Sequence, residues 1–249
     1  MDKNYYTEYF QLERSHWWFL ARQEILRTQV VKLFGSSQSL RILNIGAATG
    51  ASSQMLQAFG HVVSVEYEQD CIEFVKDKLD FPLIYGSILE LSFPDQSFDL
   101  VCAFDVIEHV NDHLLAANEM RRVCKPNGYV MATVPAFMEL WSKHDEVNHH
   151  FRRYRQREFL GLFKQEKIVY SSYFNFYLFL PIYALRNFSK LFPKQIKRSG
   201  SGSDFGLVKS ILLNSFFYRM FLSENLFLNQ YIKLPFGVSL LGIWQKQSA

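Results

Sequence analysis

The stretch Leu40-Arg41-Ile42-Leu43-Asn44-Ile45-Gly46-Ala47-Ala48-Thr49-Gly50 decides the fold of this chain. A short apolar strand ends in small residues, and an amphipathic helical pattern follows. Glycine lets a backbone approach a ligand closely, and the free N–H groups of the next helix face whatever is bound. The next strand pattern, residues 61–66, ends in Glu66 about 20 residues after the turn, where an acid can accept from a ribose diol. Together, these features predict a nucleoside site.

Strand and helix patterns alternate through the middle of the chain. The strands are expected at residues 40–45, 61–66, 82–86, 98–104 and 128–134, and the helices at 51–59, 69–79 and 111–123. This alternation predicts a parallel sheet with helices on both faces. A helix over 15–34 is expected before it. A helix over 155–164, a strand over 167–174 and a closing strand over 237–244 are expected after it.

Four later segments follow the glycine turn along the chain, and their order carries a family resemblance: Leu91–Val101, Ala103–Val110, Arg121–Val130 and Thr133–Pro135. With the glycine turn, they resemble the class I S-adenosylmethionine-dependent methyltransferases from residue 40 to residue 135. The flanking segments His16–Arg22 and His150–Tyr154 are similar to the branch of that family found with bacterial surface-glycan and lipid biosynthesis.

The resemblance implies an α/β fold, with a Rossmann-like seven-stranded methyltransferase sheet flanked by helices and a last strand that runs antiparallel. The expected parts are an N-terminal helical segment (1–35), the methyltransferase core (36–174), an aromatic-rich helical cap (175–235) and the final strand (236–249). The expected function is a transferase that uses S-adenosylmethionine as cofactor and methylates a small-molecule, sugar-linked or lipid-linked acceptor. O-methylation is favoured over N- or C-methylation.

The resemblance also implies the cofactor-binding residues. Arg22 is expected at the carboxylate of the cofactor, Glu66 at the ribose, Tyr67 on the adenine and Asp105 at the methionine part. Without the resemblance, Arg22 reads equally as a surface helix arginine. The alternative for Glu66 and Tyr67 is an ordinary strand end, which Gly46 and Gly50 upstream disfavour. The remaining expected contacts come from the glycine turn and from the segment after the third strand: Asn44, Gly46, Ala48, Gly50, Ser87 and Ile88.

Three positions depart from the family pattern. Asn44 stands where the family usually has an aspartate, so the charge that orients the loop and the ammonium end of the cofactor is lost. Ala48 replaces a glycine, and its extra methyl is tolerated if φ is negative there. Ser87 replaces an acid that commonly faces the adenine amino group. These departures favour weaker cofactor binding and leave an alternative function, a non-catalytic S-adenosylmethionine-binding module in a glycan or lipid pathway.

His109 is the candidate catalytic residue, because an imidazole near neutral pH can take a proton from a hydroxyl. A second interpretation is that Glu108 and His109 only orient the following helix. A third is a divalent metal, since some relatives with an acid-x-x-Glu-His segment bind one and His149 or His150 could complete such a site. The match is partial, so no metal is expected.

The expected acceptor-binding residues are His150, Arg152, Arg153 and Tyr154. Adjacent arginines and a histidine suit a carboxylate or phosphate, as in an acidic sugar, a nucleotide-linked sugar or a lipid phosphate. In the alternative, these arginines pair with Glu158 and Asp145. The aromatic region from 170 to 229 reads as a cap packed on the sheet, and alternatively as a membrane-interface surface or an apolar acceptor pocket.

Composition narrows the classes of function. The net charge of +3 argues against nucleic acid as a partner, because no long basic block supplies the phosphate contacts. Cys71, Cys102 and Cys124 lie far apart and are expected as buried thiols in a reducing compartment. The first residues have no signal-peptide pattern, so the protein is expected in the cytoplasm. It is expected to be a monomer or a weak dimer. The segment from Asp105 to His109 disfavours the rival class, an NAD-dependent dehydrogenase.

Overall fold

The computed structural model describes residues 3–191 and 210–248. Its sheet has the order β3-β2-β1-β4-β5-β7-β6, with neighbouring strands parallel except at β7, which is antiparallel to β5 and β6. The expected seven-stranded sheet with an antiparallel last strand is therefore confirmed. The strands are β1 (Leu40–Ile45), β2 (Gly60–Glu66), β3 (Leu83–Tyr85), β4 (Phe98–Phe104), β5 (Cys124–Pro135), β6 (Lys167–Phe174) and β7 (Ser239–Gln245).

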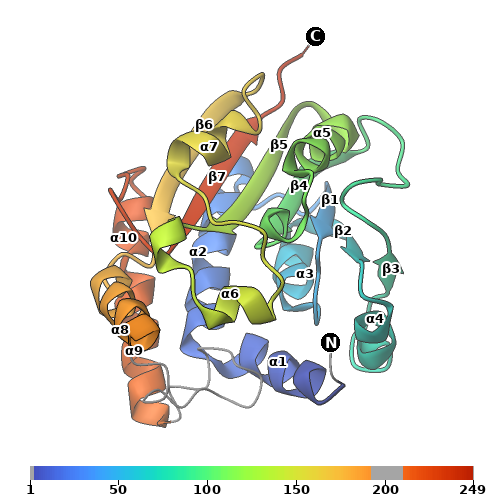
Figure 1. Cartoon of the computed structure of the whole chain (residues 1–249). Helices are drawn as coiled ribbons and strands as arrows, with labels where there is room; N and C mark the ends of the chain where they lie inside the picture. Colours follow the sequence, from blue (N-terminus) through green and yellow to red (C-terminus); the bar gives the residue numbers. More distant parts are fainter. Residues whose placement is uncertain (1–2, 192–209, 249) are drawn as a thin grey trace.

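Helices cover both faces of the sheet (Figure 1). Those near the N-terminus and the glycine turn are α1 (Lys3–Ser15), α2 (Trp17–Phe34), α3 (Ala51–Leu56), the 3-10 turn η1 (Gln57–Phe59) and α4 (Gln69–Val75). Those in the second half of the core are η2 (Ile107–His109), α5 (His113–Val123), η3 (Met138–Leu140), α6 (Lys143–Val147) and α7 (Gln156–Gly161). The cap contains α8 (Phe179–Leu191), α9 (Ile211–Ser223) and α10 (Asn225–Leu228).

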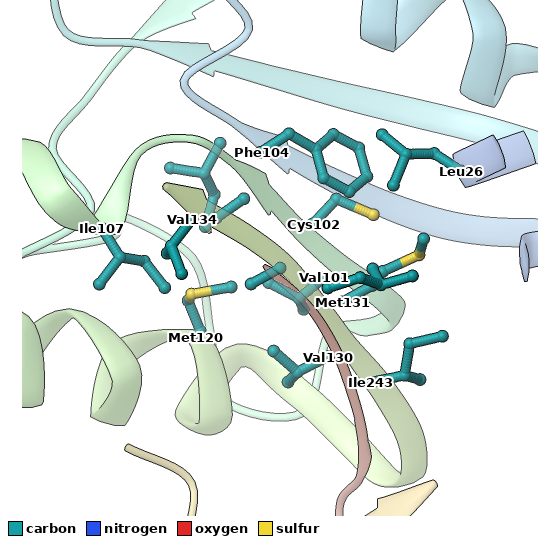
Figure 2. Close-up of a cluster of buried hydrophobic side chains, with 14 of the residues drawn as sticks. Leu26, Val101, Cys102, Phe104, Ile107, Met120, Val130, Met131, Val134 and Ile243 are labelled. Atoms are coloured by element: carbon teal, nitrogen blue, oxygen red, sulfur yellow. The ribbon is translucent and has the colours of Figure 1, made fainter. Parts of the chain in front are cut away.

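The core lies on both sides of β4 and β5. Figure 2 shows Leu26 of α2 on one side of these strands and Met120 of α5 on the other, and both side chains are fully buried. Near-continuous apolar runs in the strands, such as Leu100–Phe104, are typical of a parallel sheet that is covered on both faces. This arrangement leaves the carboxyl ends of β1, β2, β4 and β5 as the place where a ligand can bind.

The N-terminal helix differs from the expectation. The sequence predicts one helix over 15–34, whereas the structure has α1 and α2 with a break at His16. The His16 side chain accepts from the Trp18 N–H at 3.3 Å and caps the start of α2. This capping role is not visible in the periodicity of the sequence, since histidine is an uncommon cap.

The cap region is helical, as expected, and joins the N-terminal helices. Asn214 of α9 accepts from the Trp17 N–H at 2.9 Å and donates to the Ser15 carbonyl at 3.0 Å. Residues 192–209 of the expected cap lie outside the described residues. Across 3–191 and 210–248, no helix is both long enough and apolar enough to cross a membrane.

Candidate functional site

A cavity of about 880 Å³ lies at the carboxyl ends of the strands, between α1, α2, α6 and α8. Residues from the glycine turn, the N-terminal helices and the cap meet there. The cavity brings together most of the predicted site residues, namely Arg22, Gly46, Ala48, Glu66, Tyr67, Ser87, Ile88, Asp105, His109, His150 and Arg153. Four predicted residues do not line it: Asn44, Gly50, Arg152 and Tyr154.

The glycine turn is built from left-handed backbone. Gly46 has φ of 67° and Gly50 has φ of 90°. A Cβ on Gly46 would come within 2.4 Å of a Val106 methyl, so the residue must stay small. Ala48 also has a positive φ, 47°, in place of the negative value that would spare its methyl from strain. An L-residue in this region costs roughly 1–2 kcal/mol, so the turn holds a strained alanine at the edge of the cavity.

Glu66 joins the turn to the end of β2. Its carboxylate accepts from the N–H groups of Ala48 at 2.8 Å, Tyr67 at 2.9 Å and Glu68 at 3.0 Å. Burial raises the pKa of Glu66, and these three hydrogen bonds oppose that effect. A carboxylate has about four lone-pair positions, so accepting capacity remains for a hydroxyl ligand.

Asn44 does not line the cavity and instead contacts helix α3, which follows the turn. It is buried, and its amide donates to the hydroxyls of Ser52 at 2.9 Å and Ser53 at 2.8 Å. Its side-chain oxygen is buried without a hydrogen-bond partner among the described residues. Asn44 therefore holds the first turn of α3 against β1 and brings no charge to the loop.

Arg22 and Asp105 form an ion pair at the carboxyl ends of β4 and β5. Arg22 Nη2 lies 2.6 Å from Asp105 Oδ2 and donates to Thr133 Oγ1 at 3.2 Å. The Nε group of Arg22 is buried and has no partner within the described residues. Arg22 also lines the cavity, and Asp105 holds its guanidinium in place.

Two further residues at the turn come from α1 and were not expected there from the sequence. Glu13 accepts from the Thr49 hydroxyl, and Arg14 donates to the Thr49 carbonyl at 3.0 Å. Both partners lie 35 or more residues away, and the helix expected from the sequence began only at Ser15. The one local signal that could have identified Glu13 and Arg14 is a pair of adjacent charges shortly before the capping histidine, His16.

The expected adenine-side residues, Tyr67 after β2 and Ser87 and Ile88 after β3, line the cavity. Tyr67 is 61% exposed and stacks on Tyr85, with ring centroids 5.9 Å apart. Ser87 Oγ accepts from the Leu89 N–H at 3.1 Å, which fixes the turn that carries Ile88.

Glu108, His109 and His150 form a cluster at the opposite wall. Ligand atoms of all three lie within 4.8 Å of one another, the spacing of a metal site. Both Glu108 oxygens are buried without a partner in the part of the chain that the structure describes. His150 Nδ1 lies 2.9 Å from Asp145 Oδ1, and a carboxylate partner of this kind orients many metal-binding histidines.

Burial and the neighbouring histidines lower the pKa of His109 to about 3. The imidazole is therefore neutral at pH 7. It can accept a hydrogen bond or bind a metal, but a base with so low a pKa is a weak one.

The two predicted arginines have different environments. Arg153 is buried, and its Nε donates to Asp145 Oδ1 at 2.7 Å, as the pairing alternative expects. Arg152 points away and donates to the Asn111 carbonyl at 2.8 Å. The hydroxyl of Tyr154 lies 2.9 Å from His113 Nδ1 and is also outside the cavity. Only His150 and Arg153 of the predicted acceptor set therefore reach the site.

Comparisons with known proteins agree with this geometry. Residues 43–132 match the family model described as "Methyltransferase domain". A curated relative, the demethylmenaquinone methyltransferase of Staphylococcus aureus (strain MRSA252), is 29% identical over 135 residues. That match covers 49% of this chain and 56% of the relative, so it spans little more than half of the relative's length.

Two solved structures share the fold over most of the chain. A chain of the complex between the Haloferax volcanii Trm112 methyltransferase activator and a methyltransferase has a TM-score of 0.61 and 14% identity. It covers 99% of this chain and 96% of its own. Phosphoethanolamine N-methyltransferase 2 of Haemonchus contortus, in complex with S-adenosyl-L-methionine, has a TM-score of 0.57 and 14% identity. It covers 90% of this chain and 52% of its own.

Proposed function

We propose that the protein transfers a methyl group from S-adenosylmethionine to an apolar, hydroxyl-bearing acceptor, because residues 43–132 match the family model described as "Methyltransferase domain". The observation that carries the proposal is one cavity that joins the glycine turn and Glu66 at one wall to the Glu108–His109–His150 cluster at the other. A cavity of 880 Å³ is large enough for a cofactor and part of a second molecule.

The residues present fit the cofactor. Glu66 keeps accepting capacity for the ribose hydroxyls, and Tyr67 and Ile88 offer apolar surface to the adenine. Arg22, which lines the cavity, suits the carboxylate, while Asp105 holds the guanidinium in position. Gly46 lines the cavity, and glycine lets a backbone approach a ligand closely.

S-adenosylmethionine, when bound, supplies an already activated methyl group. The protein therefore has to align the acceptor, exclude water and receive a proton. Leu178, Ile182 and Phe217 from the cap make part of the cavity wall apolar and help to exclude water. His109 lines the cavity and is the group proposed to receive the proton of an acceptor hydroxyl, although its lowered pKa makes it a weak base.

The acceptor is proposed to be a lipid-like or sugar-linked small molecule. Two observations support this class: apolar cap residues line the cavity, and Arg153, buried beside Asp145, lines it as well. The Staphylococcus relative is named for a quinone substrate, which is consistent with an apolar acceptor. A peripheral membrane contact through the cap is part of the same proposal, since α9 begins with exposed Ile211 and Leu212.

Methyl transfer can be tested with methyl-labelled S-adenosylmethionine and two fractions of a bacterial extract, the lipid fraction and the water-soluble fraction. We expect label to enter the lipid fraction and S-adenosylhomocysteine to form in equal amount. Label in the water-soluble fraction alone would contradict the lipid-like class. Cofactor binding without transfer to either fraction would favour the non-catalytic module.

A further inference from the structure

The charged side chains around the cavity differ in how closely an opposite charge approaches them. Arg22 pairs with Asp105 at 2.6 Å, and Arg153 pairs with Asp145 at 2.7 Å. Glu13 also lines the cavity. In the described ranges, the one cation within 4.0 Å of its carboxylate is Arg14, at 4.0 Å.

Glu13 is buried at the outer end of the glycine turn. It accepts from the Thr49 hydroxyl and from the backbone N–H of Ala51. The charged and titratable groups that face it are Arg14 of the same helix, Arg22 of α2 and Cys71 of α4. Burial raises the pKa of Glu13 to about 7, because these neighbours do not offset the loss of water. A carboxylate in such a place gains from a cationic ligand.

The residue of β1 that lies under the same turn has no charge. Asn44 stands under the turn, and its amide donates to Ser52 and Ser53. Glu13 therefore supplies a carboxylate where the strand residue has none. Arg14 keeps the two helices and the turn together, because it donates to both the carbonyl and the hydroxyl of Thr49.

We propose that Glu13 binds the ammonium group of the amino-acid part of S-adenosylmethionine, while Arg22 binds its carboxylate. An amino-acid zwitterion needs one buried anion and one buried cation, and α1 and α2 supply them from one side of the cavity. Figure 1 shows the end of α1 meeting the start of α2. The assignment rests on the proposed function, since it specifies how this chain holds the cofactor.

Two ligands with a neutral sulfur test the assignment by calorimetry. S-adenosylhomocysteine carries the amino-acid part, and 5′-methylthioadenosine lacks it. We expect Glu13→Gln to weaken S-adenosylhomocysteine binding by about 10- to 100-fold, the range for a lost hydrogen bond to a charged group. Affinity for 5′-methylthioadenosine should stay within about twofold, which also reports that the variant is folded. Glu8→Gln removes the same charge from α1 outside the cavity lining and should change neither affinity.

A proton measurement gives a second readout. A cation beside Glu13 favours its charged form, so S-adenosylhomocysteine binding near pH 7 should release protons from the parent and fewer from Glu13→Gln. Binding heats in two buffers of different ionisation enthalpy measure this release. Glu13→Asp, which keeps the charge, should lose less affinity than Glu13→Gln.

An equal loss of both ligands in Glu13→Gln would overturn the assignment, because it would mean that Glu13 only holds the turn. Unchanged affinity for both would overturn it as well. A parent protein that binds neither ligand would instead contradict the proposed function.

Discussion

At the scale of single residues, Ala48 is the strained point of the site. Its φ of 47° suits glycine, whereas Ala47 beside it has no such strain and is packed against Val75 and Leu83. We expect Ala48→Gly to raise the free energy of unfolding by about 0.5 kcal/mol, since relief of strain exceeds the added entropy of the unfolded chain. Urea unfolding measures the change.

Ala47→Gly is the matched control for that prediction. It removes a buried methyl without relieving strain, so it should lower the free energy of unfolding by about 1 kcal/mol. If both variants lose stability equally, the left-handed backbone at Ala48 carries no cost.

Glu66 should bind the ribose, and its loss should affect every adenosine ligand. We expect Glu66→Ala to weaken S-adenosylhomocysteine and 5′-methylthioadenosine alike, by about 1.5–3 kcal/mol. Glu13→Gln should affect only the first of these ligands, so the two variants distinguish the ribose end from the amino-acid end. Unchanged binding in Glu66→Ala would remove the ribose assignment, and a melting temperature far below that of the parent would indicate that its bonds to the turn dominate.

The role of His109 separates into two measurable cases. If His109 receives the acceptor's proton, His109→Ala should lower kcat by about 10²–10⁴-fold with unchanged cofactor affinity. If Glu108, His109 and His150 bind a divalent metal, chelation should abolish turnover of the parent and Mn²⁺ should restore it. Full kcat in His109→Ala, together with indifference to chelation, would leave only the helix-orienting role.

At the scale of elements, Glu224 at the junction of α9 and α10 fixes the segment that enters α8. It accepts from the Phe176 N–H at 2.7 Å and from the Tyr177 N–H at 3.2 Å. Burial raises the pKa of Glu224 from 4.5 to about 7. Between these two values the folded state binds more protons than the unfolded state. The contribution of Glu224 to the free energy of unfolding is therefore present in full below pH 4.5 and is lost as the pH rises through 7.

We therefore expect each such group to contribute a fall in the free energy of unfolding from pH 5 to pH 7, by up to about 1.4 kcal/mol per pH unit, against the rise that His109, with its pKa lowered from 6.5 to about 3, contributes over part of this range. Glu224→Gln should remove part of this slope, and Glu13, with a pKa of about 7, should account for another part. A slope that Glu224→Gln leaves unchanged would contradict the titration of this carboxyl group in the folded protein.

At the scale of the whole molecule, the cap joins the cavity to an exposed apolar surface on α9. Ile211 is 86% exposed and Leu212 82%, while Phe217 of the same helix lines the cavity. We expect Leu212→Glu to lower binding to vesicles of phosphatidylethanolamine and phosphatidylglycerol by about tenfold or more, with an unchanged melting temperature.

Leu114→Glu on α5 is the matched control, since this leucine is also exposed but lies on a helix far along the chain from the cap. It should leave vesicle binding unchanged. Equal vesicle binding by the parent and Leu212→Glu would remove the membrane contact from the proposed function.

The sequence alone determined the sheet, the turn and the place of Glu66. Alternation of apolar strands with amphipathic helices is a local property, and so is the run of small residues after β1. These patterns identify strand ends, and in a parallel sheet the carboxyl ends of neighbouring strands share one edge. Asp105 and His109, which follow β4, were therefore predictable as members of one site with Glu66, whereas Arg22 of α2 was expected only from the family resemblance.

Only the tertiary structure decided which side chains reach the cavity and what they contact there. Arg152 and Arg153 are adjacent in sequence, yet only Arg153 faces Asp145, because side chains alternate along an extended segment. Glu13 meets Thr49 only because α1 folds back over the turn, a contact between residues 36 positions apart. Such pairings depend on the packing of distant elements, and no local pattern of the sequence records them.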